Sequence, residues 1–113
     1  MIQFIEESRG KLHQLAIISN MTRDTLAFMN RHFQWLELFD ELIFSCEIGI
    51  SKPDTRIYEA CLSRLEIPPQ ECLFVDDSEE NVLGAMKSGM KVIHFKSFPQ
   101  FQQELEENFY LYQ

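Results

Sequence analysis

The sequence predicts an α/β fold, in which helices cover both faces of a parallel sheet of four strands to make a three-layer sandwich. Short apolar runs without polar alternation recur along the chain, which is typical of strands buried on both faces. Segments with helical spacing of apolar residues separate these runs, and the connections are short. Because no repeat or low-complexity linker interrupts this order, we expect residues 1–113 to form a single domain.

The predicted elements follow from these patterns and from the residues that flank them. The predicted strands are residues 15–18, 42–44, 73–75 and 92–95. The predicted helices lie within residues 2–8, 22–33, 53–65, 78–88 and 98–109. For their starts, Thr22 (or Asn20) and Ser78 suit the N-cap, and Pro53 suits the first helical position. For their ends, Gly10 and Gly89 suit the position just past a helix.

Helical spacing also marks the apolar positions of each helix, which we expect to face the core. In the first half of the chain these are Leu26, Phe28, Met29 and Phe33, and then Ile57, Tyr58, Cys61, Leu62 and Leu65. In the second half they are Val82, Leu83, Ala85 and Met86, and then Phe98, Phe101, Leu105 and Phe109.

The composition excludes several classes of protein. The formal net charge is −8 and 45% of the residues are hydrophobic, so a core can form, whereas a nucleic-acid surface would need clustered Lys and Arg. No apolar run approaches the ~20 residues of a membrane span, and the N-terminal residues lack a signal-peptide core. Cys46, Cys61 and Cys72 have no zinc or redox spacing. We therefore expect a cytoplasmic protein with reduced thiols and no nucleic-acid or membrane partner.

Polar side chains gather where the predicted strands end. Ser19 and Asn20 follow the first strand, Lys52 lies in the loop after the second, and Asp76 and Asp77 end the third. Open α/β sheets bind their ligands at this edge. A phosphate site needs a hydroxyl and main-chain N–H groups for the phosphoryl oxygens, a lysine for their charge and a carboxylate for Mg²⁺. Each residue also has a plain structural reading, as a helix cap, an acid near a helix start or a solvated lysine.

Several motifs resemble those of the haloacid dehalogenase-like hydrolases. They are Ser19-Asn20 after a buried strand, Lys52-Pro53 before a helix, and the stretch from Phe74 to Ser78 with Asn81, Gly84 and Gly89 behind it. The resemblance covers residues 15–95 and implies a Rossmann-like core. It also implies a hydrolase, and the Asp-Asp pair with Lys-Pro-Asp resembles small-molecule phosphatases more than the dehalogenases that share the scaffold.

The resemblance implies a role for each residue at the phosphate. Ser19 would hold a phosphoryl oxygen through its hydroxyl, helped by the main chain at Asn20. Lys52 would pair with the nucleophile and with the transferring group. The substrate would be a small phosphorylated metabolite, whose identity the sequence does not give.

The resemblance also implies a Mg²⁺ site. Asp77 would ligate the ion, and Asp76 would either ligate it or orient the lysine. Asn81 would support this loop. Because part of the usual ligand set is missing, we expect Mg²⁺ binding to be weak or absent in this chain alone.

The chain departs from the family at the nucleophile. Family members begin with a strand ending in Asp-x-Asp, whose first Asp attacks the substrate and whose second is the general acid/base. The 113 residues contain no such pair, and the five aspartates are Asp24, Asp40, Asp54, Asp76 and Asp77. The cap region that normally precedes Ser19 is also absent. The sequence therefore resembles the C-terminal core portion of such a hydrolase, and we expect it to be inactive alone.

Two classes of function stay open on this basis. The first is a Mg²⁺-dependent hydrolase of the phosphatase type, whose front portion comes from upstream sequence or another chain. The second is a shortened, non-catalytic binding or interaction module. An in-frame Asp-x-Asp behind an apolar run, upstream of Met1, would favour the first.

The missing strand has a structural consequence. In related proteins it lies in the middle of the sheet, between the strands that here end at Ser19 and Asp76. Each backbone group left unpaired and shielded from water costs roughly 1–3 kcal/mol. We therefore expect that these two strands close up and pair directly, or that a segment of another chain adds the missing strand.

Overall fold

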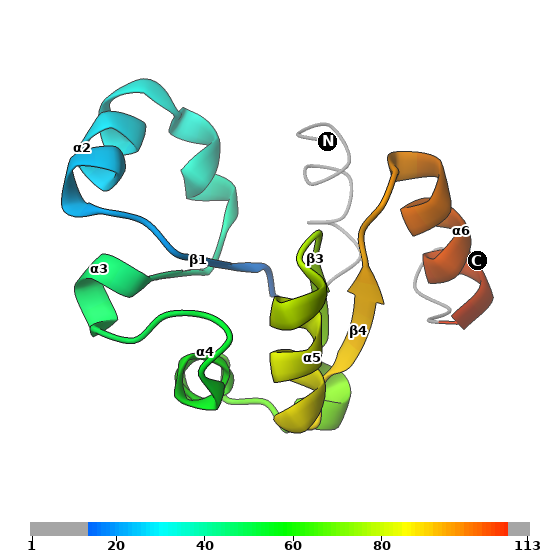
Figure 1. Cartoon of the computed structure of the whole chain (residues 1–113). Helices are drawn as coiled ribbons and strands as arrows, with labels where there is room; N and C mark the ends of the chain where they lie inside the picture. The colour runs from blue at the N-terminus through cyan, green and yellow to red at the C-terminus, as the bar shows by residue number, and fades with distance from the viewer. Residues whose placement is uncertain (1–13, 109–113) are drawn as a thin grey trace.

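The computed structural model describes residues 14–108 and shows strands alternating with helices (Figure 1). The strands are β1 (Ala16–Ser19), β2 (Glu41–Phe44), β3 (Leu73–Asp76) and β4 (Lys91–His94). The helices are α2 (Arg23–His32), α3 (Ser45–Ile48), α4 (Thr55–Leu65), α5 (Glu79–Lys87) and α6 (Phe98–Asn108), with 3-10 turns η1 (Gln34–Leu38) and η2 (Pro69–Glu71). All four predicted strands are confirmed. The predicted helix at residues 2–8 lies outside the described residues.

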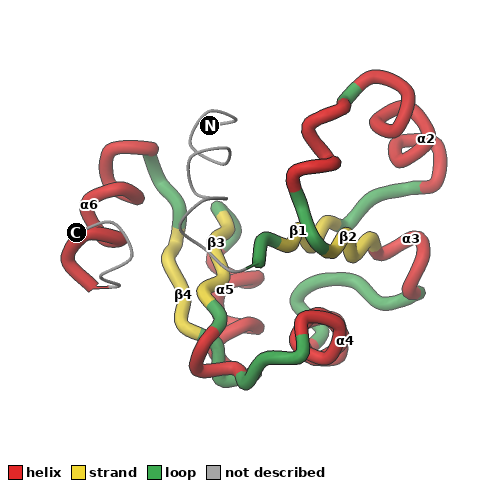
Figure 2. Tube along the Cα trace, turned by 180° about the vertical axis from the view of Figure 1, so that it is seen from behind, coloured by secondary structure: helices red, strands yellow, loops and turns green. Residues whose placement is uncertain are grey.

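The strands form two separate parallel pairs, so the prediction of one four-stranded sheet is wrong. β1 pairs with β2, with Ile17 opposite Leu42, and β3 pairs with β4, with Phe74 opposite Val92. Within residues 14–108, β1 and β3 do not pair, so the expected direct closure is also wrong. The two pairs run in different directions (Figures 1 and 2). β1, β2, β3 and α4 instead meet through one apolar cluster of side chains.

Helices cover both faces of the β3–β4 pair, as the sequence predicted. Phe74 and Val92 point into the cluster that includes residues of α4 and α5. Their strand neighbours Val75 and Ile93 pack on the other face, against α6. Because successive side chains of a strand point to opposite faces, this alternation gives three layers around the second pair.

The helix α4 carries the largest part of the core. All five apolar positions that the spacing marked are buried, namely Ile57, Tyr58, Cys61, Leu62 and Leu65. The helix begins later than predicted, because Asp54 is its N-cap and accepts a hydrogen bond from the Arg56 N–H at 3.0 Å. Pro53 therefore lies before the cap and not at the first helical position.

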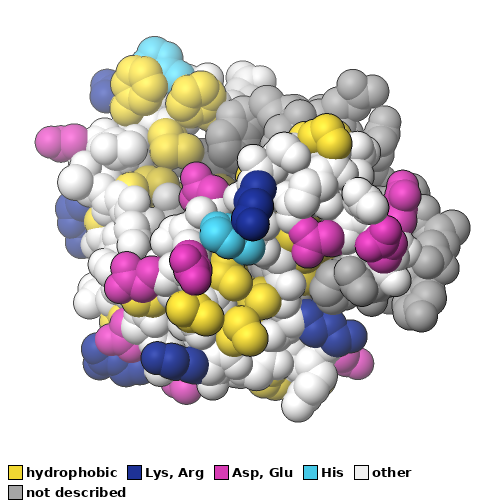
Figure 3. Space-filling view, turned by 45° about the vertical axis from the view of Figure 1, so that its right-hand side comes forward, with side chains coloured by type: hydrophobic (Ala, Val, Ile, Leu, Met, Phe, Trp, Pro, Cys, Tyr) yellow, Lys and Arg dark blue, Asp and Glu magenta, His cyan; other side chains and the backbone are white. Residues whose placement is uncertain are grey.

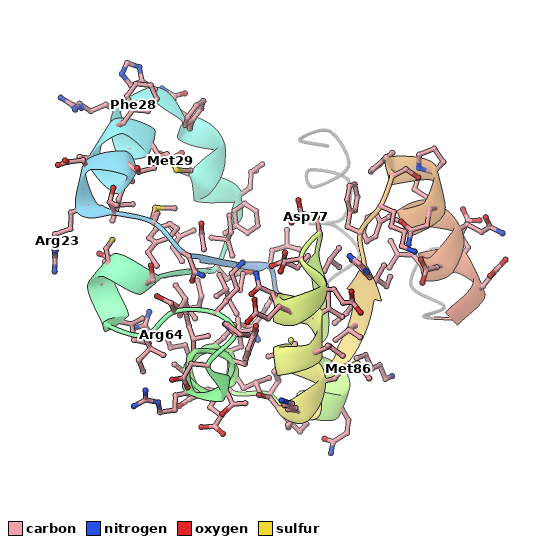
Figure 4. The ribbon with its side chains drawn as sticks, in the orientation of Figure 1. Arg23, Phe28, Met29, Arg64, Asp77 and Met86 are labelled. Carbon is pink, nitrogen blue, oxygen red and sulfur yellow. The ribbon has the colours of Figure 1, made fainter. Side chains whose placement is uncertain are left out.

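Two other helices bury less than their spacing suggested. Thr22 caps α2 as predicted, but none of the residues of α2 is buried, and the Phe28 side chain is 50% exposed. On α5, Leu83 and Met86 are 49% and 53% exposed. Figure 4 shows Phe28 on the outer side of α2, and Figure 3 shows hydrophobic side chains gathered on one face among charged ones. Spacing shows which side of a helix is apolar, but a neighbour must be present to cover it.

The helices of the described part are short. The longest, α4 and α6, have 11 residues each. Within residues 14–108, no helix is long and apolar enough to cross a membrane. The three cysteines are free thiols, and burial raises the pKa of Cys61 to about 12.

Candidate active site

An ion pair between Lys52 and Asp76 lies at the centre of the site. The Lys52 Nζ is 2.8 Å from the Asp76 Oδ2, and the two side chains are only 11% and 9% exposed. The same ammonium lies 5.9 Å from the centre of the Phe74 ring, within cation–π range. Two charges shielded this far from water need each other, because removing one leaves the other buried without a partner.

The carboxylate of Asp76 has partners on both oxygens. Its Oδ1 accepts from the Ser78 N–H at 2.9 Å, and its Oδ2 accepts from the Asn81 side-chain amide at 3.2 Å as well as from Lys52. Burial acts to raise the pKa of Asp76, but the Lys52 ammonium and the two N–H donors outweigh it and hold the pKa below its ordinary value. Asp76 therefore remains an anion that fixes the position of Lys52.

The start of α5 supplies two of these donors. Ser78 is its N-cap, as predicted, and the Ser78 Oγ accepts from the Asn81 N–H at 3.4 Å. Because Asn81 lies in the first turn, its amide reaches back to the carboxylate at the end of β3. The partial positive charge of a helix start also favours an anion here.

Asn20 connects the end of β1 to the lysine loop. Its Oδ1 accepts from the Lys52 N–H at 2.8 Å, and its Nδ2 donates to the Lys52 carbonyl at 3.1 Å. The structure therefore brings together Asn20, Lys52, Asp76 and Asn81, which we call the Lys52 cluster. All four were singled out from the sequence.

Ser19 and the residue after Asn20 complete the end of β1. Ser19 is the last residue of the strand and is partly buried, and within residues 14–108 its hydroxyl has no hydrogen-bond partner. The Ser45 Oγ accepts from the Met21 N–H at 2.9 Å and donates to the Met21 carbonyl at 3.2 Å. Ser45 thus holds the chain in place just beyond Ser19 and Asn20, and leaves the Ser19 hydroxyl available to a ligand.

Asp77 differs from Asp76 in every respect that matters for a ligand. It lies where β3 gives way to α5 (Figure 4), its side chain is exposed, and within the described part of the chain its carboxylate has no partner. Its main-chain carbonyl is 2.9 Å from the His94 Nε2. Because a carbonyl only accepts, that nitrogen must carry a proton. His94 therefore fixes the backbone of Asp77 and leaves its carboxylate free.

The donor set suits a metal ion that keeps water and substrate oxygens as ligands. Asp77 offers one free carboxylate, whereas both oxygens of Asp76 are already engaged. Within residues 14–108, no three His, Cys, Asp or Glu side chains gather into a metal site. Mg²⁺ commonly binds through one or two carboxylates, with phosphate and water completing its octahedron. The described residues therefore fit Mg²⁺, but they supply only part of its coordination shell.

Three contributing residues were not predicted from the sequence. Helical spacing predicts Tyr58 as a core residue only, whereas its hydroxyl also donates to the Asn81 carbonyl at 2.8 Å. Ser45 directly follows a predicted strand, and this strand-end position is the sequence feature by which it could have been identified. His94 is the last residue of β4 and shares the strand-end position of the other site residues.

Comparisons with known proteins agree with this architecture. The sequence model of the haloacid dehalogenase-like hydrolases matches residues 1–95. The chain is 32% identical over 95 residues to the sesquiterpene phosphatase astK of Aspergillus oryzae, which covers 83% of this chain and 48% of the relative. It is 39% identical over 91 residues to the glyceraldehyde 3-phosphate phosphatase of Methanothermobacter thermautotrophicus, which covers 75% of this chain and 38% of the relative. The chain thus spans less than half the length of either relative.

A solved structure shares the fold over nearly the whole chain. It is a haloacid dehalogenase family enzyme from Bacteroides thetaiotaomicron in complex with magnesium and inorganic phosphate. The TM-score is 0.78 at 22% identity, over 99% of this chain and 56% of the other. Since the family's sequence model matches most of the chain, this protein belongs to the haloacid dehalogenase-like hydrolases.

Proposed function

We propose that this chain carries the phosphate- and metal-binding half of a Mg²⁺-dependent phosphatase, which acts in the cytoplasm on a small phosphorylated metabolite. The Lys52–Asp76 pair carries this proposal, because it fixes a cation at the residue that precedes Asp77, whose exposed carboxylate has no partner within residues 14–108. Two of the relatives named above are phosphatases. That favours a phosphate ester over a haloacid as the substrate.

Each residue has a defined part in this proposal. The Ser19 hydroxyl and the main chain at Asn20 would hold phosphoryl oxygens, and the Lys52 ammonium would neutralise their charge. Asp76 positions Lys52, Asn81 supports Asp76, and Asp77 would hold the metal. A bound Mg²⁺ would supply further neutralisation of the phosphate charge.

The attacking carboxylate is the part that these 113 residues lack, since no Asp-x-Asp occurs in them. A covalent phosphoryl-enzyme needs such a nucleophile. We propose that it comes from a segment, upstream or on another chain, that adds a strand between β1 and β3. The chain by itself would then be inactive, which keeps the non-catalytic binding module as the second candidate function.

The deciding experiment restores the absent part. The portion of the Aspergillus oryzae phosphatase that this chain does not match is fused ahead of Met1, and hydrolysis of p-nitrophenyl phosphate is measured with and without Mg²⁺. We expect Mg²⁺-dependent turnover in the fusion and none in the chain alone. Lys52→Ala should lower it by about 10²–10³-fold, whereas Lys87→Ala, at an exposed lysine of α5, should not change it. A folded fusion without turnover would favour the binding module.

A further inference from the structure

Tyr58 is fully buried, and yet its hydroxyl reaches the candidate site. The residue lies in the first turns of α4 with 0% of its surface exposed. Its ring packs edge-on against Phe74, with 5.2 Å between ring centres and 85° between planes. Its hydroxyl donates to the main-chain carbonyl of Asn81, on α5, at 2.8 Å. A phenylalanine would keep the ring packing, so the hydroxyl is a separate feature that packing alone does not require.

The residue that Tyr58 holds is the residue that holds Asp76. The carbonyl of Asn81 accepts from Tyr58, and the side-chain amide of the same Asn81 donates to the Asp76 Oδ2 at 3.2 Å. That oxygen is also the one that accepts from the Lys52 Nζ. A continuous series of contacts therefore runs from Tyr58 through Asn81 and Asp76 to Lys52.

The same hydroxyl closes a loop between two helices. Lys52 precedes α4 by only a few residues, whereas Asp76 precedes α5. The separation of these helices therefore sets the separation of the two charges. At Gly84 on α5, an added Cβ would lie 2.7 Å from the Pro53 carbonyl oxygen and 3.0 Å from the Tyr58 Cε2. Packing thus prevents a closer approach at this point, and the Tyr58 hydroxyl resists a wider one.

We propose that Tyr58 is a positioning residue, whose hydroxyl sets the distance between Lys52 and Asp76 by holding the first turn of α5 to α4. It touches neither the proposed substrate nor the metal. Burial and the nearby charges of Asp76 and Glu80 raise the pKa of Tyr58 to about 12, so the hydroxyl keeps its proton and remains a donor at neutral pH. This inference rests on the proposed function in one point only, namely that Lys52 neutralises the charge of a bound phosphate.

The test follows the Lys52 ammonium in the unliganded chain by ¹H–¹⁵N NMR. In the unaltered protein the ion pair should slow exchange of the Lys52 Nζ protons with water, relative to the exposed Lys87. Tyr58→Phe should speed this exchange by about fivefold, equivalent to ~1 kcal/mol at 1.4 kcal/mol per factor of ten. Asn81→Ala should have a similar effect, and the double variant should exceed Asn81→Ala alone by little, because both act on one series of contacts.

A matched variant separates positioning from general loss of stability. Leu65→Val trims another buried residue of α4, at the opposite end of the helix from Tyr58, and should leave the Lys52 exchange unchanged. Unchanged exchange in Tyr58→Phe would overturn the inference, and so would failure of that variant to fold, since the ring alone should support the fold. Effects of Tyr58→Phe and Asn81→Ala that simply add would also count against it.

The test is independent of the proposed function. Inorganic phosphate with Mg²⁺ is added in a second titration of the unaltered chain, and the Lys52 signal is followed. No response of Lys52 to phosphate would weaken the proposed phosphate site. The comparison of variants without phosphate would still decide the role of Tyr58.

Discussion

The side-chain amide of Asn20 makes two hydrogen bonds to the backbone of Lys52. It accepts from the Lys52 N–H at 2.8 Å and donates to the Lys52 carbonyl at 3.1 Å. These are the only hydrogen bonds between the end of β1 and the lysine loop that the described residues show. The lysine is thus held at its backbone by one strand end and at its ammonium by another.

The first prediction concerns this link. Asn20→Ala removes both hydrogen bonds, which lie at the surface, and should lower the free energy of unfolding by about 1 kcal/mol. Urea denaturation monitored by circular dichroism measures the change. Asn30→Ala, at an exposed residue of α2, is the matched control and should stay within ~0.5 kcal/mol of the unaltered chain. Equal losses in both variants would show that the link contributes nothing specific.

The second prediction concerns the loss of folding stability at low pH. The pKa of Asp76 is lowered in the folded state, so its contribution is complete above its unfolded value of about 3.9. That contribution is lost as the pH falls through the still lower folded value. The Asp76→Asn variant should therefore lose less stability than the unaltered chain when the pH is lowered. It should also destabilise the chain at pH 7 by roughly 3 kcal/mol, because Lys52 is left buried without its partner.

The control for Asp76 is a second acidic residue in an ion pair at the surface. Asp54 pairs with Arg56 at 2.7 Å, but the Arg56 side chain is 68% exposed. Asp54→Asn keeps an N-cap residue for α4, and should leave stability close to that of the unaltered chain. Thermal unfolding between pH 3 and 7, without added metal, compares the two variants. An Asp76→Asn variant as stable as Asp54→Asn would show that the Lys52 pair is not needed for folding.

The third prediction concerns the close approach of α5 to the lysine loop. Gly84→Ala would normally favour a helix by about 1 kcal/mol. Here the new methyl group would meet the Pro53 backbone at 2.7 Å, and overpacking of this kind costs roughly 1–3 kcal/mol. We expect net destabilisation by about 1 kcal/mol in urea, whereas Met86→Ala, at an exposed site of the same helix, should be nearly neutral. A stabilised Gly84→Ala would mean that the loop moves aside freely.

Several features of the fold and of the candidate site were predictable from the sequence. The helix α4 was predicted with its five buried positions, because periodicity and burial coincide when a helix packs against a core. The members of the Lys52 cluster were singled out because Asn20 and Asp76 stand at strand ends, Asn81 stands in a helix's first turn, and Lys52 stands in the loop before a helix. The hydroxyl of Tyr58 was missed, because periodicity treats tyrosine as an apolar residue and carries no information on its donor.

What could not be predicted depends on contacts far apart in the sequence. The strand pattern is the same whether β1 and β3 join or stay apart, so the split into two pairs was not readable from it. The exposure of Phe28 and Leu83 has the same origin. Their spacing correctly marks an apolar side, but whether another element covers that side is a property of the whole assembly.

The fourth prediction concerns metal binding. Asp77 offers one free carboxylate, and Mg²⁺ loses hydration water reluctantly. Binding by calorimetry without phosphate should therefore be weak, with a dissociation constant in the millimolar range, or about −4 kcal/mol. Asp77→Asn should abolish it, whereas Asp24→Asn, at an exposed residue in the first turn of α2, should not. Micromolar binding without phosphate would show that further ligands exist.

The last prediction concerns the strand that we propose between β1 and β3. Each pairs on one edge only among the described residues, and a parallel strand that reaches both would join the two pairs into one sheet ending at the Lys52 cluster. A ligand that binds only the folded state stabilises it by about 2.7 kcal/mol at a hundred times its dissociation constant. The unmatched portion of the Aspergillus oryzae phosphatase, added in trans, should therefore raise the melting temperature with its concentration and slow amide exchange in β1 and β3.

A version with a proline in the middle of the inserted strand, which cannot donate to the ladder, should do neither. Equal effects of both versions would show that the added portion binds elsewhere than between these strands.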